Sequence, residues 1–307
     1  MFQRHVRELM AWLRLPKDPK AADYGKYEVA LSTAEQLLTE VDALTSEAVH
    51  DEGIELMTML LHLQNSLVDG HEVSFAVQRH RAMVMAITQA PSLLFNHVAS
   101  TAFAPNLSLT ARLDCLDVLH DASQEMSADL ILQSRELSNM VAVAAAQPPE
   151  QVGNSRRWGH TARAYQSVGR ATTVAQPNRF APHAASLLFT ILAEYRQPNQ
   201  TVANLRTEPV FLAKLLRCLG MVIQSARHAL ASPRMAQRLG EFCWHLRLHT
   251  DASVRRGVLL VYARVVHAGE PEVPTRTDIV DWLEDALLQE TDEVARDMAR
   301  SLHCLLA

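Results

Sequence analysis

Glycine is scarce in this chain, with 10 residues in 307, and the glycines do not gather into a phosphate-binding loop. The sequence also lacks a GxSxG elbow and the Cys/His setting of a thiol nucleophile, so we expect no enzymatic activity. No stretch alternates apolar and polar residues as a β-strand does. The nearest candidate, residues 141–144, carries alanines that favour a helix. With 48% hydrophobic residues, the chain is predicted to be all-α.

Cysteines and long apolar runs are equally rare. Cys115, Cys218, Cys243 and Cys304 lie in apolar helical stretches and form no CxxC pair, so we expect reduced thiols in the core. No apolar run approaches the roughly 18 to 20 residues needed to span a bilayer. The N-terminus is amphipathic and charged, unlike a signal sequence. These absences favour a soluble intracellular protein without a disulfide framework.

Basic charge does not dominate any large part of the chain. Residues 1–146 carry 10 basic and 19 acidic side chains, residues 147–180 carry 5 and 1, and the remainder is balanced. An overall basic footprint for nucleic acid is therefore absent. The acidic first part weakly favours a basic partner.

The stretch Met235 to His267 reads as two helices joined by a short corner. Both halves place apolar side chains at intervals of three and four residues, as a helix with one buried face does. Thr250, Asp251 and Ser253 can accept hydrogen bonds from the free N–H groups that open the second helix. The pattern predicts one hairpin of an α-solenoid.

The same design returns in residues 278–306. The pattern of Asp251 and Arg255 recurs less strictly at Asp292 and Arg296, 41 positions later. This interval is typical of HEAT-type helix pairs. The sequence therefore predicts a HEAT-like α-solenoid, an armadillo-type superhelix of about thirteen helices.

We expect these helices to form two blocks. The N-terminal block, residues 1–146, holds helices over residues 2–15, 27–44, 46–64, 72–89, 91–103, 109–126 and 128–146. The C-terminal block, residues 179–307, holds helices over residues 180–195 and 208–230, followed by the two hairpins described above.

Residues 147–178 separate the blocks and show no apolar periodicity. They read as a loop or linker that interleaves guanidinium groups with aromatic rings, at Arg156, Arg157, Trp158, Arg163, Tyr165 and Arg170, with Arg179 just beyond. Such side chains can stack on bases or pair with phosphates and acidic groups. The segment is thus either a contact surface or a solvated loop.

Arg255 and Arg256 open the second helix of the central hairpin, where positive charge opposes the helix dipole. We expect an acidic side chain of the same or the neighbouring hairpin, such as Asp251, to hold them. Together with Asp292 and Arg296, these residues would form a structural ladder; partner binding is the alternative.

Gly257 lies inside the same helix. A glycine there costs about 1 kcal/mol relative to alanine. We therefore expect a neighbouring helix to approach closely at this position.

Two patterns suggest a metal site. His245 and His249, with Cys243 nearby, have a spacing that can hold zinc, but no HExxH glutamate lies between them and Cys243 belongs to the apolar face. His120-Asp121 resembles the doublet of all-α metal-dependent phosphohydrolases. The other metal ligands of such a site have no clearly positioned counterparts in this sequence. We predict no metal and no cofactor.

Several stretches are similar to one known family. Residues 112–127, 178–195 and 239–266 resemble the C-terminal half of the telomere length regulation protein family, and weaker matches at 5–15, 55–66 and 103–112 keep the same order. The patterns Asn178-Arg179-Phe180 and Phe242-x-Trp244-x-Leu246-Arg247 are specific for it.

The resemblance implies a non-catalytic α-solenoid, a cochaperone subunit of the TTT complex, in the cytoplasm and nucleus. Its partners would be two HEAT-type subunits, the ninety-kilodalton heat-shock chaperone and phosphatidylinositol-3-kinase-related kinases. Through these kinases, members of the family are linked to TOR signalling, DNA-damage checkpoints and telomere maintenance. A telomeric DNA-binding module that uses the Arg-rich linker is the alternative.

The chain departs from the family in one respect. It contains no acidic serine cluster of the kind that the RuvB-like ATPase adaptor complex reads, and no large N-terminal solenoid. We expect either a fragment or a naturally short member, and direct recruitment of the adaptor is then in doubt.

Overall fold

The computed structural model describes residues 2–16, 21–39, 47–65, 72–145, 178–227, 229–268 and 274–306. Within these ranges all regular structure is helical, which confirms the predicted all-α class. The elements are α1 (Phe2–Leu13), α2 (Ala21–Thr39), α3 (Glu47–His62), α4 (Glu72–Gln89), α5 (Pro91–Thr101), α6 (Leu109–Ala145), α7 (Ala181–Arg196), α8 (Gln200–Arg206), α9 (Pro209–Ser225), α10 (Ser232–Leu246), α11 (Ala252–Ala268), α12 (Arg276–Gln289) and α13 (Glu293–Leu306).

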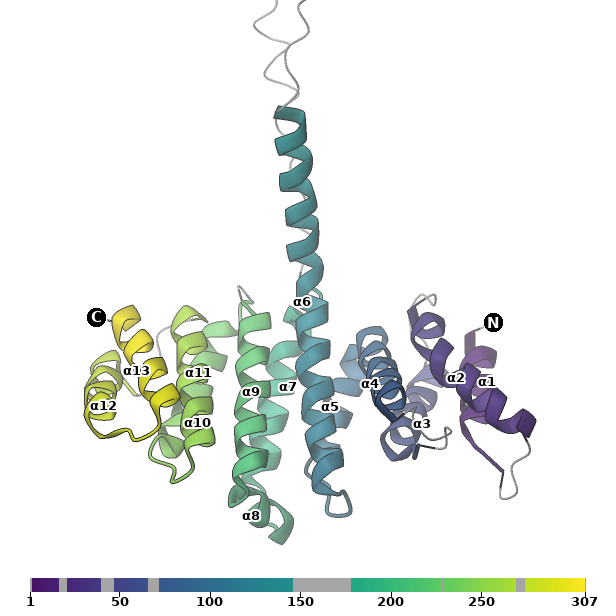
Figure 1. Ribbon diagram of the computed structural model, residues 1–307, viewed down its shortest axis with the longest axis horizontal. Coiled ribbons are helices and arrows are strands. Elements are labelled where there is room, and N and C mark those ends of the chain that lie inside the picture. Colours follow the sequence, from purple (N-terminus) through teal and green to yellow (C-terminus); the bar gives the residue numbers. More distant parts are fainter. Residues whose placement is uncertain are drawn as a thin grey trace, which may run out of the picture.

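The helices stack side by side in two layers (Figure 1). One layer runs α2, α4, α6, α9, α11, α13, and each helix contacts the next. The other layer runs α1, α3, α5, α7, α10, again with contacts between successive helices, and α12 packs on α13. The described chain is thus the α-solenoid that the 41-residue repeat predicts, with the N-terminal and C-terminal hairpins at opposite ends.

Two helix assignments from the sequence were wrong. Helices were expected to break near Ser127, but α6 continues through it, and the Ser127 hydroxyl donates to the Gln124 carbonyl of the preceding turn at 2.8 Å. The short helix α8 was missed. Asn199 caps it by accepting from the Val202 N–H at 2.8 Å, and Val202 and Leu205 are buried.

The predicted length of one more helix was also wrong. Helix α9 ends at Ser225 and does not reach Leu230, whose side chain is fully exposed.

The helices on either side of residues 146–177 are in direct contact. Helix α5 packs on α7 and α6 packs on α9. The Phe95 and Phe180 rings meet edge to face at 5.3 Å between centroids, and an ion pair of 2.6 Å joins Lys214 to Asp117. The division into two blocks stays a prediction.

Helices α9 and α11 approach closely at glycine. A Cβ added to Gly257 would lie 3.0 Å from Leu216 Cβ and Cδ1, which confirms the close approach expected there. On the facing helix, a Cβ added to Gly220 would meet the end of the Arg264 side chain at 2.7 Å. Each glycine lets the opposing helix supply the side chain that fills the contact.

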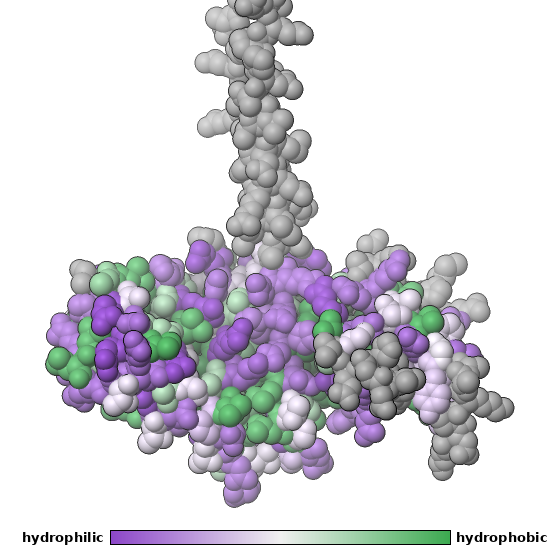
Figure 2. All heavy atoms as spheres, viewed as in Figure 1, coloured by the Kyte–Doolittle hydropathy of each residue, from purple (hydrophilic) through white to green (hydrophobic). Residues whose placement is uncertain are grey.

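The described surface is mostly hydrophilic on the face shown in Figure 2, with hydrophobic groups over the lower ends of α6 and α9. No helix among the described residues has the length and apolar character that a membrane span requires. Cys115, Cys218 and Cys243 are buried as expected, but Cys304 is exposed, because it faces away from the last packed helix pair.

Candidate functional site

The corners that open α11 and α13 are built alike. Asp251 accepts from the Ser253 N–H at 2.8 Å, and Asp292 accepts from the Ala295 N–H at 2.8 Å. Each carboxylate thereby satisfies a backbone donor at a helix N-terminus. The hydrogen bonds from Ser253 lower the pKa of Asp251, and those from Arg256 and Ala295 lower the pKa of Asp292 to about 2.

The arginine four residues after each aspartate reaches back to the start of its corner. Arg255 Nη1 donates to the His249 carbonyl at 2.8 Å, and Arg296 Nε donates to the Glu290 carbonyl at 3.0 Å. His249 and Glu290 are 41 positions apart, like the two aspartates. The repeat in the sequence therefore corresponds to a repeated set of hydrogen bonds.

The two corners are joined by ion pairs. Arg255 Nε and Nη2 each lie 2.7 Å from a Glu290 oxygen, and Arg256 Nε lies 2.7 Å from Asp292 Oδ2. The first pair is the more enclosed: the Arg255 side chain is 19% exposed and that of Glu290 is 8% exposed. The hydrogen bond with Arg255 lowers the pKa of Glu290.

Acidic side chains of the neighbouring hairpin hold both arginines, as one of the two expected arrangements has it, but the residue suggested for this role is not the one that fills it. Asp251, suggested as the holder of the arginines, caps its own helix, and Glu290 takes the bidentate role opposite Arg255. Glu290 was missed by sequence reasoning. Its signal was its place 41 residues after His249 and two before Asp292.

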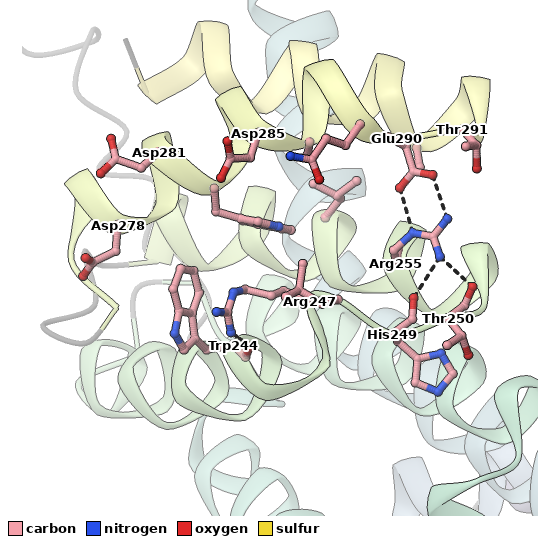
Figure 3. Close-up of a pocket in the computed structure, with 16 residues that line it drawn as sticks. Trp244, Arg247, His249, Thr250, Arg255, Asp278, Asp281, Asp285, Glu290 and Thr291 are labelled. Atoms are coloured by element: carbon pink, nitrogen blue, oxygen red, sulfur yellow. Dashed lines mark hydrogen bonds and ion pairs between the residues drawn. The ribbon is translucent and has the colours of Figure 1, made fainter.

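A groove of about 590 Å³ opens beside this ladder, between α10 and α12 (Figure 3). These two helices make less direct contact than the preceding pairs of the same layer do. Trp244 and Trp282 meet edge to face at 6.2 Å between centroids, and the Arg247 guanidinium lies 3.9 Å from the Trp244 ring centroid. The groove thus already contains one cation stacked on an indole.

Acidic side chains follow the α12 side of the groove. Asp278, Asp281 and Asp285 lie one helical turn apart and line it, and Figure 3 shows them in succession along α12. Asp278 also accepts from the Thr275 N–H at 2.8 Å as part of a capping box. Glu290 at the far end is neutralised by Arg255.

The predicted Arg/aromatic set lies outside the residues that the structure describes. This applies to Arg156, Arg157, Trp158, Arg163, Tyr165 and Arg170. Arg179, just beyond them, donates to the Thr88 carbonyl at 3.1 Å. That arginine therefore contacts the end of α4.

The His120-Asp121 doublet forms a hydrogen-bonded cluster with His80. Asp121 lies 2.8 Å from His120 Nδ1 and 2.7 Å from His80 Nε2. Burial by itself would raise the pKa of Asp121, but the hydrogen bonds with the two histidines outweigh it and lower the pKa. Asp121 thus links α4 to α6.

The residues considered for a zinc site have ordinary structural surroundings: His245 is an exposed residue of α10, and His249 lies in the corner before α11. His249 Nδ1 accepts from the Asp251 N–H at 3.0 Å, and Cys243 is fully buried, where desolvation raises the pKa of its thiol. Among the described residues, no three His, Cys, Asp or Glu side chains form a group that could hold a metal ion.

Comparison with known proteins gives a consistent result. The family model described as "Telomere length regulation protein" matches residues 3–123. The telomere length regulation protein TEL2 homolog of Homo sapiens is 29% identical over 299 residues, which cover 90% of this chain and 35% of the human protein. The homolog of Xenopus laevis is 28% identical over 298 residues and that of Mus musculus 28% over 302, with the same coverage.

The chain spans about a third, 35%, of the length of these curated relatives. No solved structure matches.

Proposed function

We propose that the chain is a member of the telomere length regulation protein family and that it is a non-catalytic scaffold in a TTT-type cochaperone complex. In this role it helps the ninety-kilodalton heat-shock chaperone to mature and stabilise phosphatidylinositol-3-kinase-related kinases, including TOR and checkpoint kinases. It acts in the cytoplasm and nucleus and contributes to telomere length regulation.

The observation that carries this proposal is the continuous two-layer stack of helix pairs from α1 to α13. Stacked repeats expose an extended surface that suits the assembly of several proteins. The similarity to TEL2 homologs over 90% of the chain supports the same role. The partners that fit it are two HEAT-type subunits and the kinases.

The proposal is tested by tagged pull-down of the full chain from cell extract at low and moderate salt, followed by mass spectrometry. Recovery of two HEAT-type subunits together with kinases of the TOR family is the expected result. Recovery of neither would overturn the scaffold role.

The alternative, DNA binding through Arg156, Arg157 and Arg163, makes a separate prediction. Affinity for single-stranded or duplex telomeric DNA would fall steeply with salt and vanish when the three arginines become alanine. Undetectable or salt-insensitive binding would end that alternative.

A further inference from the structure

The groove between α10 and α12 combines an aromatic floor with an acidic wall. Its floor is formed by Trp244 and Trp282, and the Trp282 ring also packs against Tyr262 at 5.6 Å between centroids. The floor is therefore fixed by the core of the last two hairpins. A volume of about 590 Å³ is in the range of sites that accept one or two side chains of a ligand.

The charges of the groove fit a cationic ligand. Asp278, Asp281, Asp285 and Glu290 line it against Arg247 and Arg255, a formal excess of two negative charges. Since Glu290 is already paired with Arg255, the excess lies on the three aspartates of α12. Asp281 and Asp285 are exposed. A nucleic acid backbone would be repelled by this wall.

The contact between Arg247 and Trp244 shows which chemistry the floor accommodates. The guanidinium lies 3.9 Å from the ring centroid, and its Nη1 donates to the Trp244 carbonyl at 2.6 Å. A planar cation can stack on an indole while its N–H groups reach oxygen acceptors. Since Arg247 covers the face of Trp244 and Trp282 is only 8% exposed, an incoming arginine would find its partners in the exposed carboxylates of Asp281 and Asp285 at the edge of this aromatic floor.

We propose that the α10–α12 groove is a docking site for a segment of a partner protein that presents arginine side chains next to an apolar residue. The arginines pair with Asp281 and Asp285, and the apolar group packs on the indoles. This proposal rests on the scaffold function and specifies its surface. It assigns the recognition of a basic partner to the C-terminal end of the solenoid, away from the acidic excess of residues 1–146.

The test measures fluorescence anisotropy of a short labelled peptide in which arginine alternates with leucine, titrated with the full chain. The double variant D281K/D285K is expected to weaken binding about tenfold or more, because both attractive charges become repulsive. Both positions are exposed and lie inside α12 beyond its capping box, so the fold is expected to persist. Thermal melting of each variant checks this.

Glu28→Lys is the matched control for Asp281→Lys. Glu28 is also an exposed carboxylate inside a helix, on α2 at the other end of the solenoid, so both substitutions change the net charge equally. Trp244→Leu removes the indole face but keeps apolar volume, and it is expected to weaken binding as well. Wild-type affinity retained in either D281K/D285K or W244L, or equal weakening by the single variants D281K and E28K, would overturn the proposal. So would a failure of the arginine peptide to bind the wild-type chain.

Pull-down with D281K/D285K separates this proposal from the scaffold function. If the wild-type chain and the variant recover the same partner subunits, the groove is not the docking site, and the scaffold function stands. If the peptide binds the groove but the wild-type chain recovers no HEAT-type subunit or kinase, the groove stands and the scaffold function falls.

Discussion

Replacing Arg255 by alanine is expected to be among the most destabilising single changes at the surface of the last two hairpins. The guanidinium makes two contacts of 2.7 Å with Glu290 and donates to the carbonyls of His249 at 2.8 Å and Thr250 at 2.7 Å. The two contacts with Glu290 join this hairpin to the next, and the two with the carbonyls of His249 and Thr250 hold the corner of Arg255's own hairpin. Their loss therefore weakens the contact between repeats, not only one helix end.

The magnitude follows from the burial of Glu290. Its side chain is 8% exposed, so R255A would leave a carboxylate without its cation in a poorly solvated place. Breaking a buried pair in this way costs roughly 3 to 5 kcal/mol. Because the Arg255 side chain is 19% exposed, we expect the lower end, about 3 kcal/mol. Glu290→Ala would leave the arginine able to reach water, and should cost less.

The control is Arg300→Ala. Arg300 pairs with Asp297 in the same end of the molecule, but these side chains are 60% and 63% exposed. Such surface pairs contribute about 1 kcal/mol or less. Urea unfolding of both variants, followed by circular dichroism, measures the difference. Equal destabilisation by R255A and R300A would show that burial of the pair does not matter here.

Reversing the charge of either arginine is a stronger test of these ion pairs. Arg255→Glu or Arg256→Glu would place carboxylates against Glu290 or Asp292, so we expect both to weaken folding more than partner binding. Loss of partner recovery with an unchanged melting curve would contradict this expectation.

Gly257→Val is expected to cost about 2 kcal/mol or more, because even one Cβ would lie 3.0 Å from Leu216. Gly220→Ala should change the free energy of unfolding by about 1 kcal/mol or less, since the added carbon meets chiefly a flexible guanidinium and alanine favours the helix. Urea unfolding compares the two variants. A greater loss of stability in G220A than in G257V would refute this account of the packing. The pKa of Asp292 falls from 3.8 to about 2 on folding, so its contribution to stability is complete above about pH 4 and is lost as the pH falls toward 2. The variant D292N should remove that part of the acid dependence in melting curves, and an unchanged curve would count against the ion pair. Cys304 should react with a maleimide in the folded chain while the three buried cysteines stay protected, as peptide mapping would show; protection of Cys304 would contradict its exposure.

The hairpin corners could be predicted from sequence because their information is local. Asp251 and Asp292 are capping residues at a fixed interval, and each accepts from backbone N–H groups within its own corner. The close approach at Gly257 was also predictable, because a glycine inside a helix has a known cost.

The groove could not be predicted, since it depends on how far α10 and α12 diverge. Periodicity places Trp244 and Trp282 on their helices but does not say that their rings meet. The partner of Arg255 could not be predicted for the same reason. Asp251 lies four residues before Arg255, and Glu290 lies at the corner of the next hairpin, so either carboxylate was a candidate. Only the stacking of the hairpins selects Glu290. Ser127 illustrates a third cause, because a hydroxyl that could start a new helix bonds back into the old one.

Because α5 stacks directly on α7 and α6 on α9, we expect the two halves of the solenoid to stay together without an intact peptide link between residues 145 and 178. The seam holds the Phe95–Phe180 and Phe103–Phe211 ring pairs, and Asn178 donates to the Ser225 carbonyl at 2.6 Å. A chain cut once within 146–177 should therefore behave as a split protein, whose two fragments co-elute and reassemble when they are expressed separately. The solenoid offers this position for an inserted reporter or protease site without disturbing the order of its layers.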